Sequence, residues 1–113
     1  MPSASDSWVS QIRKGVVEMA VLSLLAERER YGSEIVETLK SHPELAITGG
    51  TVYPLMARLK KSGVIDSSWR ESPVGPPRKY YRLTATGRAQ LSEMASAWHG
   101  VSKTIDGLLK GID

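Results

Sequence analysis

The spacing of hydrophobic residues changes twice along the chain. Up to Gly63, apolar residues recur at the i, i+3, i+4, i+7 interval of helices that bury one face. From there to Leu83 the interval shortens to two, which is typical of strands, and beyond Thr84 the helical interval returns. This pattern predicts a mainly α-helical α+β domain in which a β-hairpin separates the last helix from the others.

The best-defined helix is expected within residues 47–65. Its apolar stripe consists of Val52, Leu55, Met56 and Leu59. Thr48 is a candidate N-cap, and Ser62-Gly63 is a usual helix end. One local rule is broken, because Pro54 in the second turn removes a hydrogen bond and should kink or loosen the helix start.

The opposite face of this helix is small, hydroxylated, aromatic and basic, which suits entry into the major groove of DNA. We expect its DNA contacts to come from Gly50, Thr51, Tyr53, Arg58 and Lys61. Taken alone, such a face more often belongs to an ordinary amphipathic surface helix with solvated lysines. The flanking elements favour DNA binding.

Two further helices are expected before this one. Residues 8–26 carry a wide apolar stripe and predict a largely buried first helix. The polar run 27–30 is interpreted as a loop. A second, short helix begins near Gly32 and stops at Ser41-His42-Pro43, since the residue before a proline avoids the helical region. Together with residues 47–65, these segments predict a helix-turn-helix arrangement.

Residues 64–71 and 78–83 are expected to form a hairpin, with residues 72–77 as its turn. Alternation places Arg78, Tyr80 and Arg82 on one face of the second strand, and Lys79, Tyr81 and Leu83 on the other. A hairpin this short is marginal in isolation, so it must pack on the helices as a wing. Its candidate DNA-binding residues are Arg78, Lys79 and Tyr80.

Thr84 can cap a last helix that runs to about Lys110. Its apolar residues follow the alternating spacing of a coiled-coil seam: Leu91, Met94, Trp98, Val101, Ile105 and Leu108. A small winged domain cannot cover so long a seam, which predicts a homodimer. Residues 1–83 are therefore expected to bind DNA and residues 84–113 to dimerise, the latter packing with residues 8–26 as one structural unit.

The 113-residue chain has a net charge of +3, and this charge is unevenly spread. Residues 49–88 contain eight lysines and arginines and two acidic residues, so this stretch carries +6 and the remainder carries −3. A basic block within a mildly acidic protein indicates a face for a polyanion. Double-stranded DNA is the expected partner.

The composition argues against enzymatic and secreted classes. The chain has no cysteine, which excludes disulfides and thiol catalysis and indicates a reducing cytoplasm. His42 and His99 lie on different elements without spaced carboxylate ligands, so no metal site is expected, and residues 49–51 lack the lysine of a phosphate-binding loop. The longest apolar run, residues 16–26, is too short to span a bilayer. We expect a cytoplasmic, non-enzymatic protein with no cofactor.

Four stretches of the chain resemble the PadR family of bacterial transcriptional regulators, in particular its small members with one helix after the wing. They are RKGVVEMAVLSLLAE, RYGSEIVETL, GGTVYPLMARLKKSGVI and GPPRKYYRLTATGR, which cover most of residues 13–88. Pro54 belongs to this family's pattern. The resemblance implies a homodimeric winged helix-turn-helix repressor that releases its operator when an effector binds. Two-fold symmetry of the dimer would make that operator palindromic.

The resemblance also implies an apolar channel between the two chains that binds flat aromatic compounds between paired tryptophans, and two interpretations of Trp98 follow. As a ligand-binding residue it would line a site for a planar aromatic effector with Ala95, Ser102 and Val17, because small neighbours leave space beside the indole. As a core residue it would fill that space by stacking on its mate or on the first helix. An alternative function is a winged-helix protein-interaction module, which would not require the basic charge of residues 49–88.

Overall fold

The computed structural model describes residues 4–45 and 47–112, together with the side chains of Ile12, 16–45 and 47–112, and this part contains four α-helices and three strands. In chain order they are α1 (Ala4–Glu27), β1 (Arg30–Tyr31), α2 (Gly32–Lys40), α3 (Gly49–Lys61), β2 (Ile65–Ser72), β3 (Gly75–Leu83) and α4 (Ala85–Leu109), followed by a 3-10 turn, Lys110–Ile112. The strands form one antiparallel sheet in the order β1-β3-β2. The predicted α+β winged helix-turn-helix fold is confirmed.

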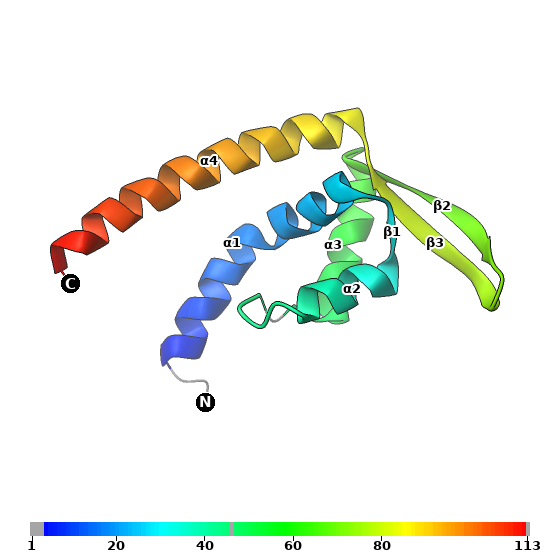
Figure 1. Ribbon diagram of the computed structural model, residues 1–113, viewed down its shortest axis with the longest axis horizontal. Helices are drawn as coiled ribbons and strands as arrows, with labels where there is room; N and C mark the ends of the chain where they lie inside the picture. Colours follow the sequence, from blue (N-terminus) through cyan, green and yellow to red (C-terminus); the bar gives the residue numbers. More distant parts are fainter. Residues whose placement is uncertain (1–3, 46, 113) are drawn as a thin grey trace.

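The helices α2 and α3 lie to one side of α1, and the β2–β3 hairpin projects from the molecule as the wing (Figure 1). α4 runs beside the C-terminal half of α1 and then diverges from it (Figure 1). The two helices therefore form an open V, and the outer half of α4 extends away from the rest of its chain.

The core lies where α1, α2 and α3 meet the base of the sheet. Its buried residues are Val21, Leu22, Leu25, Ile35, Val36, Leu39, Ile47, Val52, Leu55, Met56, Leu59, Val64, Ile65 and Leu83. The predicted stripe of α3 is confirmed, because its four members are all in this cluster. Packing of the stripe fixes the orientation of α3 and leaves its opposite face to solvent.

The expectation of a loop over residues 27–30 is wrong at its end, because Arg30 begins β1. Arg30 is only 5 % exposed: its Nε donates to the carbonyl of Leu24 at 3.1 Å, and its guanidinium pairs with Glu27 at 3.3 Å. The buried guanidinium therefore closes the end of α1, where free carbonyls carry partial negative charge. Pairing of β1 with β3 ties this end of α1 to the wing.

The hairpin is longer than expected, and its turn is shorter. The predicted turn over residues 72–77 is wrong, because only Pro73 and Val74 connect the paired strands. Pro76 and Pro77 lie inside β3 instead. The register between β2 and β3 shifts opposite these prolines, and a bulge tolerates residues that cannot donate to the ladder.

Thr84 caps α4 as predicted. Its Oγ1 accepts from the N–H of Gly87 at 3.0 Å, and its hydroxyl donates to the carbonyl of Gly63 at 2.7 Å. The backbone N–H of Thr84 donates to the carbonyl of Val64 at 3.2 Å. Gly63 has a φ of 82°, in the left-handed region that glycine adopts without strain. One residue thus joins the end of α3, the sheet and the start of α4.

The predicted seam of α4 is only partly covered within one chain. Leu91 and Met94 pack against the core. The seam residues farther along are 43 to 68 % exposed: Trp98, Val101, Ile105 and Leu108. An apolar strip therefore continues along the part of α4 that diverges from α1 (Figure 1).

Candidate nucleic-acid interface

The α3 residues predicted to contact DNA all lie outside the core: Gly50, Thr51, Tyr53, Arg58 and Lys61. Thr48 is the N-cap residue, and its carbonyl accepts from the backbone of Thr51 and Val52 at 3.0 Å, but its side chain makes no capping hydrogen bond. α3 runs through Pro54 without a break, so the loosening expected there does not interrupt the helix. Pro54 is exposed, and its lost hydrogen bond falls on the solvent side of the helix.

The ring of Tyr53 is held by two glycines. A Cβ atom on Gly32 would lie 2.9 Å from Cε1 of Tyr53, and one on Gly49 would lie 3.2 Å from its Cε2. Both positions therefore make room for the ring, which packs between the starts of α2 and α3. Tyr53 remains 47 % exposed. Its orientation is fixed while one side stays open to a partner.

The two basic residues predicted on α3 differ in their surroundings. Nη2 of Arg58 lies 3.1 Å from Oε1 of Glu18 on α1. Lys61 is exposed, and within the part of the chain that the structure describes no carboxylate pairs with it. The helix thus offers one ammonium group that is unpaired in this part and one guanidinium already shared with α1.

One face of the wing carries alternating cations and aromatic rings. The guanidinium of Arg78 lies 4.4 Å from the ring centroid of Tyr31, and that of Arg70 lies 4.8 Å from the centroid of Tyr80. The two tyrosine rings meet edge to face at 5.6 Å. Such contacts hold the cations by cation–π attraction without neutralising them.

The other face of the wing looks toward α3. Nζ of Lys79 lies 6.0 Å from the ring centroid of Trp69 and 5.7 Å from that of Tyr81. A hollow of about 220 Å³, here called the wing hollow, opens between this face, α2 and α3. Its lining is Tyr31, Gly32, Ser33, Tyr53, Trp69, Arg78, Lys79 and Tyr81. Burial, and next the neighbouring Tyr53, raises the pKa of the Tyr81 phenol, which therefore stays uncharged at neutral pH.

Trp69 was not among the residues predicted to bind DNA. It is 69 % exposed on β2, directly opposite Lys79 on β3. The pairing of the strands creates this neighbourhood, so the signal would have been available only from the correct hairpin register. An exposed indole beside a lysine suits contact with sugar and phosphate groups.

Carboxylates neutralise some cations of the wing and leave others free. Asp66 pairs with Arg82 at 3.2 Å, and its pKa is lowered first by the N–H of Ser67 and then by Arg82. Arg70 pairs with Glu29. Within the described ranges, Arg78 and Lys79 have no carboxylate partner. The uncompensated positive charge of the wing is therefore concentrated at the wing hollow.

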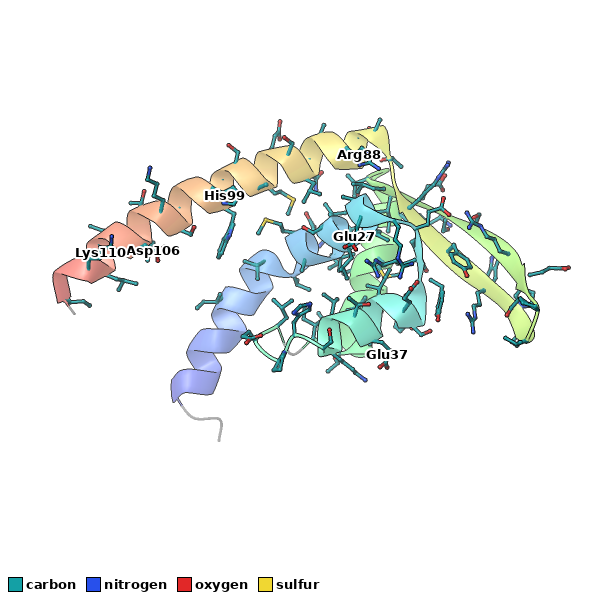
Figure 2. All side chains as sticks on the ribbon, viewed as in Figure 1. Glu27, Glu37, Arg88, His99, Asp106 and Lys110 are labelled. Atoms are coloured by element: carbon teal, nitrogen blue, oxygen red, sulfur yellow. The ribbon has the colours of Figure 1, made fainter. Side chains whose placement is uncertain are left out.

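A second concave site lies between α1 and α4. This α1/α4 groove has a volume of about 610 Å³ and is lined by Ile12, Val16, Met19, Ala20, Ser23, Glu44, Leu45, Ala95, Trp98 and His99. Of the predicted ligand residues, Ala95 and Trp98 line it, whereas Val17 packs against the core and Ser102 lies outside the lining. The lining also includes Glu44 and Leu45, from the α2–α3 connection, and His99 of α4 (Figure 2), none of which was predicted.

Searches of the described residues for other site types gave two negative findings. Groups of three or more histidine or acidic side chains placed to share a metal ion do not occur among them. Nor does any helix in this part of the chain combine the length and apolarity needed to cross a bilayer.

Comparisons with known proteins converge on one family. Residues 21–93 match the transcriptional regulator PadR-like family. The structure of a PadR-like transcriptional regulator from Bacillus cereus is similar with a TM-score of 0.81 and 37 % identity, over 88 % of this chain and 96 % of that one. A PadR family transcriptional regulator from Eggerthella lenta gives a TM-score of 0.82 and 38 % identity, over 93 % and 91 %. An uncharacterised protein from Lysinibacillus sphaericus is 34 % identical over 106 residues, covering 92 % of this chain and 97 % of that protein.

Proposed function

The chain belongs to the PadR-like family of transcriptional regulators, and from this premise we propose that it is a homodimeric repressor released from a palindromic operator by a small apolar effector. In this proposal α3 enters the major groove, and the wing contacts the phosphate backbone or the minor groove. Two-fold symmetry then calls for half-sites about one helical turn apart, roughly 34 to 36 Å, or a multiple of that distance.

The grouping of free cations with aromatic and hydroxyl side chains supports the DNA contact. Arg78 and Lys79 meet Tyr53 around the wing hollow, and Thr51 and Lys61 lie on the exposed face of α3. The cations would neutralise phosphates, while Tyr53 and Thr51 would reach base edges or phosphates. Tyr80 would hold the wing cations through its contacts with Arg70 and Tyr31. A protein-interaction module would need no such grouping of positive charge.

The salt dependence of binding to duplex DNA tests this function. Lys79→Ala should weaken binding to operator and to random duplex alike, and flatten the slope of log affinity against log salt by about 0.9 if one phosphate contact is lost. Tyr53→Ala should also change sequence preference. Lys103→Ala, at an exposed position of α4, is the matched control. Absence of salt-dependent binding by the wild type would favour the protein-interaction module.

The exposed seam of α4 supports homodimerisation. Half of the predicted seam is open to solvent in a single chain, and a second copy of α4 with α1 would cover it. Ile105→Glu should give monomeric or unfolded protein without operator binding, measured by light scattering and fluorescence anisotropy. Lys103→Glu, two residues away and off the seam, should remain dimeric. A folded Ile105→Glu monomer with wild-type affinity would refute the dimer.

The α1/α4 groove supports an effector site, since its lining is mostly apolar and Trp98 lies half-exposed within it. Planar aromatic compounds should quench Trp98 fluorescence in a Trp8→Phe, Trp69→Phe background and lower operator affinity in parallel. Trp98→Ala should abolish the response to the compound but not operator binding. If no compound quenches Trp98, and Trp98→Ala loses about 3 to 5 kcal/mol of stability, the indole is a core residue.

A further inference from the structure

Glu18 lies where three helices meet. Its Oε1 accepts from Nη2 of Arg58 on α3 at 3.1 Å, and its Oε2 accepts from Nε2 of Gln90 on α4 at 3.0 Å. The Glu18 side chain is 24 % exposed, whereas that of Arg58 is 66 % exposed. A largely enclosed carboxylate with a partner on each oxygen therefore holds an exposed guanidinium of the helix proposed to enter DNA.

We propose that Glu18 is a positioning residue of the DNA-binding site, which holds the Arg58 guanidinium in competition with DNA phosphates. The inference rests on the proposed function, because it requires α3 to approach DNA. A phosphate is an equivalent partner for a guanidinium, but it must displace the carboxylate, whose negative charge also repels it. Glu18 thus lowers the affinity for every duplex and withholds one phosphate contact.

Gln90 makes this hold depend on α4. Its amide donates to the carboxylate oxygen that Arg58 does not use, so the orientation of the carboxylate is set from α4 as well as from α1. Met19, the next residue of α1, lines the α1/α4 groove. A change in the angle between α1 and α4 therefore alters the bond that positions Glu18, and through it the availability of Arg58.

Glu18→Gln tests the proposal because it removes the charge and nearly preserves the shape. Affinity for operator and for random duplex should both rise about two- to fivefold at low salt, the range expected for releasing an exposed ion pair. The salt slope should steepen by about 0.9, since Arg58 becomes free to bind one phosphate. Glu93→Gln removes the same charge at an exposed position of α4 and measures the effect of net charge alone.

Two further variants locate the effect. In an Arg58→Gln background, Glu18→Gln should change affinity and salt slope no more than Glu93→Gln does, because no guanidinium remains to be released. Gln90→Ala should give a smaller gain in the same direction, since the carboxylate loses its second anchor. Should Glu18→Gln fail to fold, Gln90→Ala decides the question by the same two readouts.

The outcomes separate this inference from the function on which it rests. A wild-type protein that binds no duplex refutes the proposed function. A wild-type protein that binds, together with a folded Glu18→Gln variant of equal or lower affinity, overturns the role of Glu18. So does an equal gain without Arg58. A purely structural role predicts a lower Tm and weaker binding, and not tighter binding with a steeper salt dependence.

Discussion

Gly87→Ala should damage the junction between α4 and the sheet. Gly87 is buried in the first turn of α4, and a Cβ there would lie 2.0 Å from the carbonyl oxygen of Val64 and 2.6 Å from Cδ1 of Leu83. A carbon–oxygen contact needs about 3.3 Å, so the start of α4 must move by more than about 1 Å. That movement also strains the hydrogen bonds from Thr84 to Val64 and from Gly87 to Thr84.

The expected loss of stability follows from these contacts. Overpacking against backbone costs about 1 to 3 kcal/mol, and two weakened hydrogen bonds add about 1 to 3 kcal/mol. The better helix propensity of alanine offsets about 1 kcal/mol. The balance is about 3 kcal/mol, which should lower Tm by about 10 °C for a chain of this size.

Thermal and urea unfolding, followed by circular dichroism at one fixed protein concentration, would measure the loss, since a dimer's Tm depends on concentration. Gly107→Ala is the matched control, because nothing lies within 4 Å of the atom it adds. It should stabilise α4 by up to about 1 kcal/mol. A Gly87→Ala variant as stable as the wild type would show that α4 does not pack against the backbone of Val64.

Three further predictions follow from single contacts. Gly32→Ala should displace the Tyr53 ring, against which its Cβ would lie at 2.9 Å, and weaken operator binding in an anisotropy titration, whereas Ser33→Ala at the neighbouring exposed position should not; equal affinities would contradict the packing. Trp69→Ala should weaken DNA binding without flattening the salt slope, because an indole neutralises no phosphate, and Trp69→Phe should retain part of the affinity; an unchanged Trp69→Ala would remove the residue from the interface. The pKa of Glu34 is lowered, chiefly by its hydrogen bond from Arg28, so the folded state favours the carboxylate. This contribution is present above the ordinary value of 4.5 and is lost as pH falls through the lower folded-state pKa, so the Tm difference between wild type and Glu34→Gln should shrink in that range. Glu37→Gln, at an exposed position of the same helix (Figure 2), controls for charge; a difference that persists at low pH would contradict the pairing.

Elements governed by local chemistry were predictable from the sequence. The stripe on α3 follows from period alone, and Thr84 from the preference of hydroxyl residues for helix starts. Both are where expected. The prolines of the wing misled because proline usually marks a turn, and only the register shift between the strands explains how Pro76 and Pro77 enter β3.

Features that depend on contacts distant in sequence were missed. Arg30 looks like a solvated charge until the carbonyl of Leu24 and the start of β1 are placed around it. Trp69 gains meaning from Lys79 across the hairpin, and Glu18 from Arg58 and Gln90, 40 and 72 residues away. Arg58 was expected only as a DNA contact, and no periodicity could reveal its carboxylate partner.

Both elements proposed to touch DNA are attached to α1. The wing is joined to its C-terminal end through β1, which Arg30 anchors to the carbonyl of Leu24. α3 is joined to its middle through the pair of Glu18 and Arg58. The same helix supplies one wall of the α1/α4 groove. Because closely packed helices move as rigid bodies, a shift of α1 against α4 must reach the wing and α3 together, and no separate path to either is required.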